Sequence, residues 1–164
     1  MIDRTIKRVV VSFIIAAGLL PLALTGTAAG TGPRSTARTQ PTPGDKPPYT
    51  AYKGVAIGMA TEEARTKLGV PKDKSDTQDY FEFSENESAQ VYYDAAHKVT
   101  AVTVTYSGKL DGAPKPMAVF GEDAEVKPDG GIFKMVRFPR AGFWISYNKT
   151  AGDDPLIMIA MQKM

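Results

Sequence analysis

The stretch "YFEFSENESAQVYYDAAHKVTAVTVTY", residues 80 to 106, decides the fold. Its segments 80–83, 89–94 and 98–106 are rich in aromatic and β-branched residues that alternate with period two. This pattern predicts three antiparallel strands. In the third segment one set of alternate residues is apolar, as at Val102, and the other is mostly hydroxylated, as at Thr103. An apolar face beside a polar face indicates a sheet that a helix covers on one side only.

The covering helix is predicted directly upstream, at about residues 60 to 68, within "IGMATEEARTKLGVP". Glu62 and its neighbour place negative charge at the positive end of the helix. Gly69 supplies the left-handed conformation that ends a helix, and Pro71 prevents its continuation. The apolar stripe is narrow, and consists of Ala60, Ala64 and Leu68. Such a thin helix must pack on the sheet.

The same pattern recurs in the second half of the chain. "VYYD" at 91–94 is echoed by "ISYN" at 145–148, and "VTV" at 102–104 by "IMI" at 157–159, with a short helix expected near "PKPMAVFG". The spacing predicts an α+β domain at 49–164 with two related helix-plus-antiparallel-sheet units, at about 52–108 and 113–164. The second unit has the reduced helix. Chance similarity between two hairpins is the alternative.

Two segments precede the domain. Residues 1–29 have the layout of a secretory signal peptide: basic residues, an apolar run and the small-residue site at 27–29. A retained membrane anchor is the alternative, although Pro21 interrupts the run. Residues 30–48 hold five prolines and three glycines, which predicts a disordered linker. The protein is therefore expected to be exported, to the periplasm or outside the cell.

Charge and cysteine content exclude several classes of function. Loss of residues 1–29 would leave 17 basic and 17 acidic residues, so no overall basic field is expected to attract nucleic acid or an anionic membrane. The chain has no cysteine, which excludes disulfides, a thiol nucleophile and thiolate metal ligands.

A resemblance to a known family rests on residues 58–102. The sequence has Gly58-Met59, Glu62-Glu63, Leu68-Gly69 and Pro71, then an aromatic strand, a strand ending in Asp94, and "KVTAV". These features resemble the small outer-membrane-assembly lipoproteins of the SmpA/OmlA (BamE) type, and the tandem arrangement resembles the β-lactamase inhibitory protein. The resemblance is best over residues 54–107 and weak in the second half. It implies a helix-on-sheet fold and a location in the cell envelope.

The residues that carry chemistry are few. His97 is the only histidine and falls in the expected turn "DAAHKV", so it is interpreted as a solvated turn residue rather than a catalytic base. An acidic set is interpreted as solvated turn and strand charges, because its spacing does not match a calcium loop; it comprises Asp73, Asp76, Asp79, Glu82, Glu85 and Glu87. No catalytic residue, cofactor or metal is predicted, and a hydrolase is the weakest of the functional hypotheses.

A binding module is the stronger hypothesis, since a sheet covered on one side leaves the other side available to a partner. The strand registers predict the outward residues to be Tyr80, Glu82, Tyr92, Thr103, Trp144, Ser146 and Met158. The expected partner is another protein. The alternatives are an envelope protein that binds lipid or glycan, and a Trp144 that simply closes the core.

Overall fold

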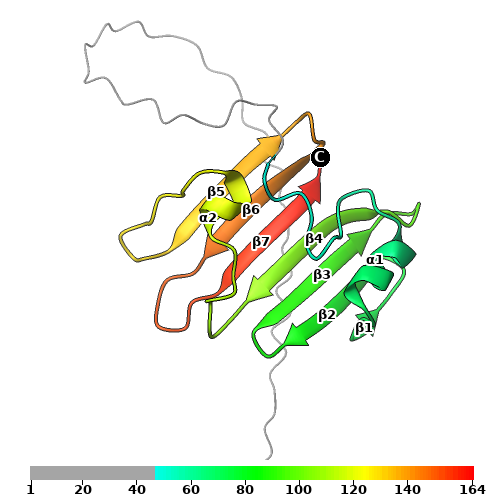
Figure 1. The fold of residues 1–164 in the computed structure, drawn as a ribbon, viewed down its shortest axis with the longest axis horizontal. Coiled ribbons are helices and arrows are strands. Elements are labelled where there is room, and N and C mark those ends of the chain that lie inside the picture. The colour runs from blue at the N-terminus through cyan, green and yellow to red at the C-terminus, as the bar shows by residue number, and fades with distance from the viewer. Residues whose placement is uncertain (1–46) are drawn as a thin grey trace, which may run out of the picture. The chain divides into compact units, whose positions relative to one another are not determined.

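The computed structural model describes residues 47 to 164 (Figure 1). The predicted signal peptide and all but the last two residues of the predicted linker lie outside the described residues. Those two are Pro47 and Pro48, and Pro47 is buried. The described residues thus begin two positions before the predicted domain start at Tyr49. Neither helix of residues 47–164 is long and apolar enough to cross a membrane.

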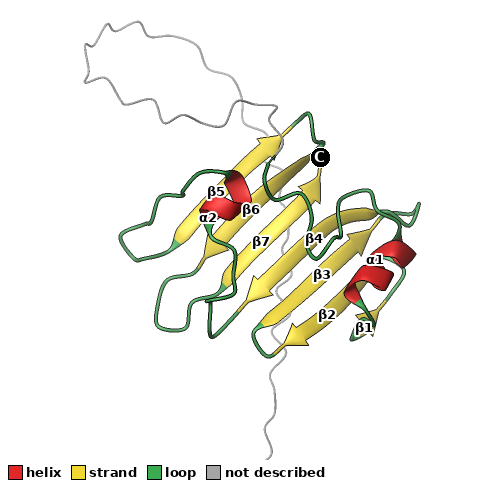
Figure 2. Cartoon of the chain, in the orientation of Figure 1, coloured by secondary structure: helices red, strands yellow, loops and turns green. Residues whose placement is uncertain are grey.

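Seven strands form one antiparallel sheet, drawn in yellow in Figure 2. They are β1 (Asp73–Lys74), β2 (Gln78–Ser84), β3 (Glu87–Tyr93), β4 (Val99–Tyr106), β5 (Ile132–Phe138), β6 (Phe143–Lys149) and β7 (Ile157–Lys163). Their order across the sheet is β1-β2-β3-β4-β7-β6-β5. The three strands predicted within residues 80–106 are confirmed as β2, β3 and β4.

Two short helices, α1 (Thr61–Leu68) and α2 (Pro116–Phe120), accompany the sheet. The described part of the chain is thus mostly β. It agrees with the expected α+β class only in that it combines an antiparallel sheet with a few helical residues. α1 lies over the β2 side of the sheet and α2 over the β5 side (Figure 1).

α1 forms where the sequence predicts it. Glu62 and Glu63 occupy its first turn, and Gly69 ends it with φ of 90°. Ala60 at the N-cap makes no side-chain hydrogen bond to the helix. The start is held instead by the turn between β3 and β4, because the N–H and the hydroxyl of Thr61 both donate to the carbonyl of His97, at 3.0 and 3.1 Å.

α2 is the reduced helix expected in the second half. It has five residues, begins with a proline at its first position and ends at Gly121, whose φ of 77° is in the left-handed region. Its last two residues, Val119 and Phe120, are buried. The helix therefore serves mainly to place two apolar side chains on the sheet.

The core lies between the sheet and these helices. Strand residues alternate between buried and partly exposed. In β6 and β7 the buried residues include Phe143, Ile145, Tyr147, Ile157 and Ile159. Ala64 of α1 joins the same core, as do Val119 and Phe120 of α2. Tyr52 and Val55 complete it from a two-residue hairpin upstream of α1. All these elements cover one face of the sheet.

Candidate interaction surface

We call the face of the sheet opposite this core the open face. The strand registers arrange its side chains in three rows across the six long strands, in the order β2, β3, β4, β7, β6, β5. The first row is Gln78, Tyr92, Ala101, Gln162, Trp144 and Arg137. The second row is Tyr80, Gln90, Thr103, Ala160, Ser146 and Met135. The third row is Glu82, Ser88, Thr105, Met158, Asn148 and Phe133.

All seven residues of the predicted interface occur in these rows. Glu82 and Met158 are exposed, and Tyr80, Tyr92, Thr103, Trp144 and Ser146 are half-buried. The register does not bring the two central aromatic residues together. Tyr92 and Trp144 share a row but are separated by β4 and β7, which is roughly 14 Å at the usual strand spacing. A partner that touches both must be wide.

Charge is scarce on the open face. Among the residues of the three rows only Glu82 and Arg137 carry a full charge, and they stand at diagonally opposite corners. Glu82 is also paired with Lys72. The middle of the face combines amides, hydroxyls, aromatic rings and methionine side chains. Such a surface fits a partner that is itself uncharged at the contact.

Sequence reasoning missed the contribution of β5. Phe133 and Met135 are 57% and 47% exposed, more than the 41% of Met158. The signal was present in "IFKMVRF", because Phe133, Met135 and Arg137 alternate with residues of the inner face. Because Lys134 interrupts the apolar pattern of that inner face, the alternation of hydrophobic residues did not identify this strand.

The interpretation of Asp79 as a solvated charge is wrong. Its side chain is 0% exposed and lies under α1. Arg65 of α1 holds it with two hydrogen bonds, Nε to Oδ2 at 2.7 Å and Nη2 to Oδ1 at 3.0 Å. The hydroxyl of Tyr93 donates to Oδ2 at 2.8 Å. Asp79 has the same strand parity as buried Phe81, so it points inward and needs these partners.

This network sets the ionisation of Asp79. Burial on its own would raise the pKa of the carboxyl, but the hydrogen bonds from Arg65 and Tyr93 outweigh it and lower the pKa below the ordinary 3.8. Burial and the bond to Asp79 raise the pKa of Tyr93. The carboxylate is therefore a permanent anion matched to a permanent cation, which suits a fixed joint between α1 and the sheet rather than proton transfer.

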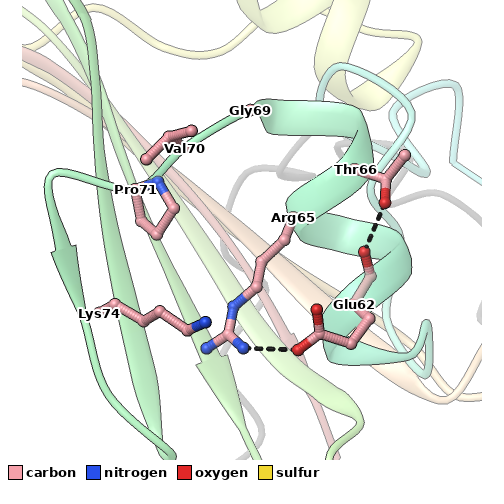
Figure 3. A pocket seen from close by; sticks show the side chains of 7 residues that line it. All are labelled: Glu62, Arg65, Thr66, Gly69, Val70, Pro71 and Lys74. Carbon is pink, nitrogen blue, oxygen red and sulfur yellow. Dashed lines mark hydrogen bonds and ion pairs between the residues drawn. The ribbon is translucent and has the colours of Figure 1, made fainter.

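An open surface hollow of about 480 Å³ lies beside this joint (Figure 3). It is lined by Glu62, Arg65, Thr66, Gly69, Val70, Pro71 and Lys74. Its best-placed polar groups are already engaged, since Arg65 Nη1 donates to Glu62 Oε1 at 2.7 Å and Thr66 Oγ1 donates to the Glu62 carbonyl at 2.8 Å. These residues form an ion pair within α1, and they do not form a nucleophile with an adjacent base.

A second cluster fixes the hairpin upstream of α1 and shows that Glu87 is not a solvated charge either. The Tyr52 hydroxyl donates to Glu87 Oε1 at 2.8 Å, and Lys53 Nζ lies 3.3 Å from the same oxygen. Burial, with Glu87 nearby, raises the pKa of Tyr106 to about 12. The Tyr49 hydroxyl is buried beside this cluster without a hydrogen-bond partner among the described residues. The cluster attaches the hairpin to the sheet.

His97 lies where it was predicted, exposed in the turn between β3 and β4, with φ of 54°. In residues 47–164 no three histidine or acidic side chains are grouped as metal ligands would be. Comparisons with known proteins add no identity: no family model, no curated protein and no solved structure matches the chain.

Proposed function

We propose that the protein is a non-catalytic binding module that holds another protein on the open face of its sheet. The observation that carries the proposal is the composition of that face. Phe133, Met135 and Met158 are exposed on β5 and β7, half-buried tyrosine and tryptophan rings lie on β2, β3 and β6, and charge is confined to two corners. Aromatic and methionine side chains with few charges are characteristic of the centres of protein interfaces.

The setting is the cell envelope or the outside of the cell. The support for this part of the proposal is the signal layout of residues 1–29, the Pro-rich residues 30–48 and the balanced charge of the remaining chain. A tether of this composition would let the domain reach a partner at some distance from its point of attachment. The resemblance to envelope assembly lipoproteins over residues 54–107 points to the same location.

A glycan is the second candidate ligand, because one observation favours it. Amide side chains lie next to aromatic rings of the open face: Gln162 lies beside Trp144, Gln78 beside Tyr92, and Asn148 beside Phe133. Isolated flat rings next to amides suit stacking on a sugar with hydrogen bonds to its hydroxyls. A glycan ligand would make Gln162 and Asn148 as important as Trp144.

The test is capture of partners from envelope extract with the mature protein, followed by affinity measurement. Trp144→Ala or Tyr92→Ala should weaken binding by about 2 kcal/mol while the Tm stays nearly unchanged. Thr105→Ala, on the same face without an aromatic ring, is the matched control and should bind as the wild type does. A large drop in Tm for both aromatic variants would show that these residues are part of the core, and would refute the interface.

The two halves of the domain are proposed to be related units. In support, each helix precedes three long strands that run as a meander, with the two-residue β1 as an extra strand in the first half. The last strand of each half, β4 or β7, meets the other in the middle of the sheet. Gly69 and Gly121 end the two helices with positive φ. If the units are related, β4 of a second copy can take the place of β7. A fragment of residues 47–108 should therefore self-associate through its β4 strands. A fragment that folds as a monomer would argue against related units.

A further inference from the structure

β5 is the last strand at one side of the sheet, and hydrogen bonds near its two ends show which of its backbone groups face outward. The carbonyl of Phe138 accepts from the N–H groups of Ala141 and Gly142, both at 3.0 Å, inside the hairpin to β6. The carbonyl of Gly131, just before β5, accepts from Lys127 N–H at 2.8 Å on the opposite side. Backbone groups of successive strand residues point alternately to the two sides. The odd-numbered residues of β5 therefore point away from the sheet.

The first part of this edge is already occupied by the chain itself. Val126 forms an antiparallel bridge with Ile132, which places Glu125 opposite Phe133. In the sheet of residues 47–164 no further strand lies beyond β5. The open stretch is thus residues 134–138, in which Met135 and Arg137 turn their N–H and carbonyl groups outward. Unpaired edges of this kind are templates for another strand.

We propose that two copies of this protein pair antiparallel through residues 134–138 of β5, around a two-fold axis at Val136. Val136 then lies opposite Val136 of the second copy, Met135 opposite Arg137, and Lys134 opposite Phe138. The two Met135–Arg137 pairs exchange N–H and carbonyl groups, so four backbone hydrogen bonds join the copies. The contact is isologous and closed, so it produces a dimer rather than a fibre.

The edge itself selects this register. In each hydrogen-bonded pair the backbone groups of both residues must point outward, so both residues must be odd-numbered. This condition allows a two-fold axis at residue 134, 135, 136 or 137. Axes at 134 or 135 would place a strand opposite Phe133, where Glu125 already lies. An axis at 137 would set Arg137 against its own copy and Met135 against Pro139, which has no N–H. Only the axis at Val136 avoids both conflicts.

The side chains suit the same register. On the inner face Val136 packs on its copy, and Lys134 is already neutralised by Glu122 of its own chain. On the open face Met135 lies against the stem of Arg137, and no like charges are opposite one another. Directly opposed residues share a face of the sheet, so the two open faces would join into one continuous surface.

The first experiment measures the mass of the purified protein by sedimentation equilibrium over a concentration series. Met135→Pro removes one outward N–H and leaves the bonds to β6 intact, as proline is tolerated on an edge strand. It should raise the dimer dissociation constant at least about tenfold, since each dimer loses two hydrogen bonds. The matched control Met135→Val keeps the N–H and should dimerise as the wild type does. A wild type that stays monomeric at its highest soluble concentration would overturn the proposal.

The second experiment tests the register and does not depend on a proline variant that folds. Because the chain has no cysteine, Val136→Cys carries a single thiol. Its Cα atoms in the two copies would be about 4.5 Å apart, within disulfide range. Mild oxidation should give a disulfide-linked dimer. Phe133→Cys is the control: it should still associate but should form little disulfide-linked dimer, since position 133 lies outside the paired stretch. Equal cross-linking of both variants, or of neither, would refute the register. Neither readout requires the partner of the proposed binding function.

Discussion

The two ends of the sheet attach their helices by different chemistry. At the α1 end, Asp79 of β2 lies opposite Val91 and is bonded beneath the helix by Arg65 and Tyr93. At the α2 end, Val136 of β5 lies opposite Ile145 on the same inner face and is apolar. One architecture thus accommodates a buried ion pair at one end and a hydrocarbon contact at the other.

The charge at the α2 end is arranged differently. Lys134 pairs with Glu122, just beyond α2, and its ammonium lies 5.2 Å from the centre of the Phe120 ring. The side chains of Lys134 and Glu122 are 19% and 34% exposed, whereas those of Arg65 and Asp79 are 13% and 0% exposed. Water reaches one pair and hardly reaches the other. The difference teaches that burial, rather than the presence of a salt bridge, decides how strongly each end depends on its charges.

The largest effect is expected from breaking the α1 joint on one side. Arg65→Met leaves Asp79 buried without its cation, which should lower the free energy of unfolding by about 3–5 kcal/mol. Urea unfolding at neutral pH measures the change. Lys67→Met, on the same helix but in an exposed pair with Glu63 at 4.0 Å, is the control and should cost less than about 0.5 kcal/mol. Similar losses for both variants would contradict the special role of burial.

Acid should weaken the same joint. The pKa of Asp79 is lower in the folded protein than its ordinary 3.8. Its contribution to stability is therefore complete above about pH 4 and is lost as the pH falls through the folded pKa. Unfolding measured at a series of pH values below 4 should show this loss in the wild type. The Asp79→Asn variant should show a shallower acid dependence, and equal slopes would disprove the assignment to Asp79.

A smaller effect is expected at the α2 end. Lys134→Met removes the cation from a partly exposed pair, and the remaining Glu122 can be hydrated. The free energy of unfolding should fall by about 1 kcal/mol. Measured beside Arg65→Met in the same urea series, it gives the ratio between the two ends directly. A loss as large as that of Arg65→Met would show that the two joints are equivalent after all.

The smallest net change is expected when the α1 end is converted to the chemistry of the α2 end. The triple variant Arg65→Met, Asp79→Val, Tyr93→Phe removes every member of the buried network together. Replacing a buried ion pair by apolar groups of similar size is often neutral or stabilising, so stability within about 1 kcal/mol of the wild type is expected. Its unfolding should also lose the acid dependence assigned to Asp79. A severe loss would show that the network specifies the position of α1.

Much of the local structure was predictable from the sequence. Period-two alternation over residues 80–106 located β2, β3 and β4, and Gly69 with Pro71 located the end of α1. The proline-limited segment before Gly121 located α2. These features depend on neighbours a few residues apart, whose side-chain directions follow from strand or helix geometry alone. Outside β5, the alternation also placed the residues of the open face and the core on their respective sides.

The candidate surface and its neighbours were less predictable. Strand parity places Asp79 on the same side as Phe81, but nothing within β2 identifies a partner for a buried acid there, because its counter-charge comes from Arg65, fourteen residues earlier. β5 was overlooked because Lys134 breaks the apolar pattern, and Lys134 faces inward only because Glu122 is there to receive it. In both positions a charged side chain is acceptable inside because another segment of the chain neutralises it.

Except at β5, the sequence by itself determined which segments become long strands and helices and which side chains share a face. The tertiary structure alone decided that β4 pairs with β7, so that two separate meanders become one sheet and Tyr92 and Trp144 fall in one row. Among residues 47–164 it also left residues 134–138 of β5 without a strand paired to their outer side. The physical reason is that alternation is a property of neighbouring residues, whereas pairing between strands some fifty residues apart is set by the packing of a shared core.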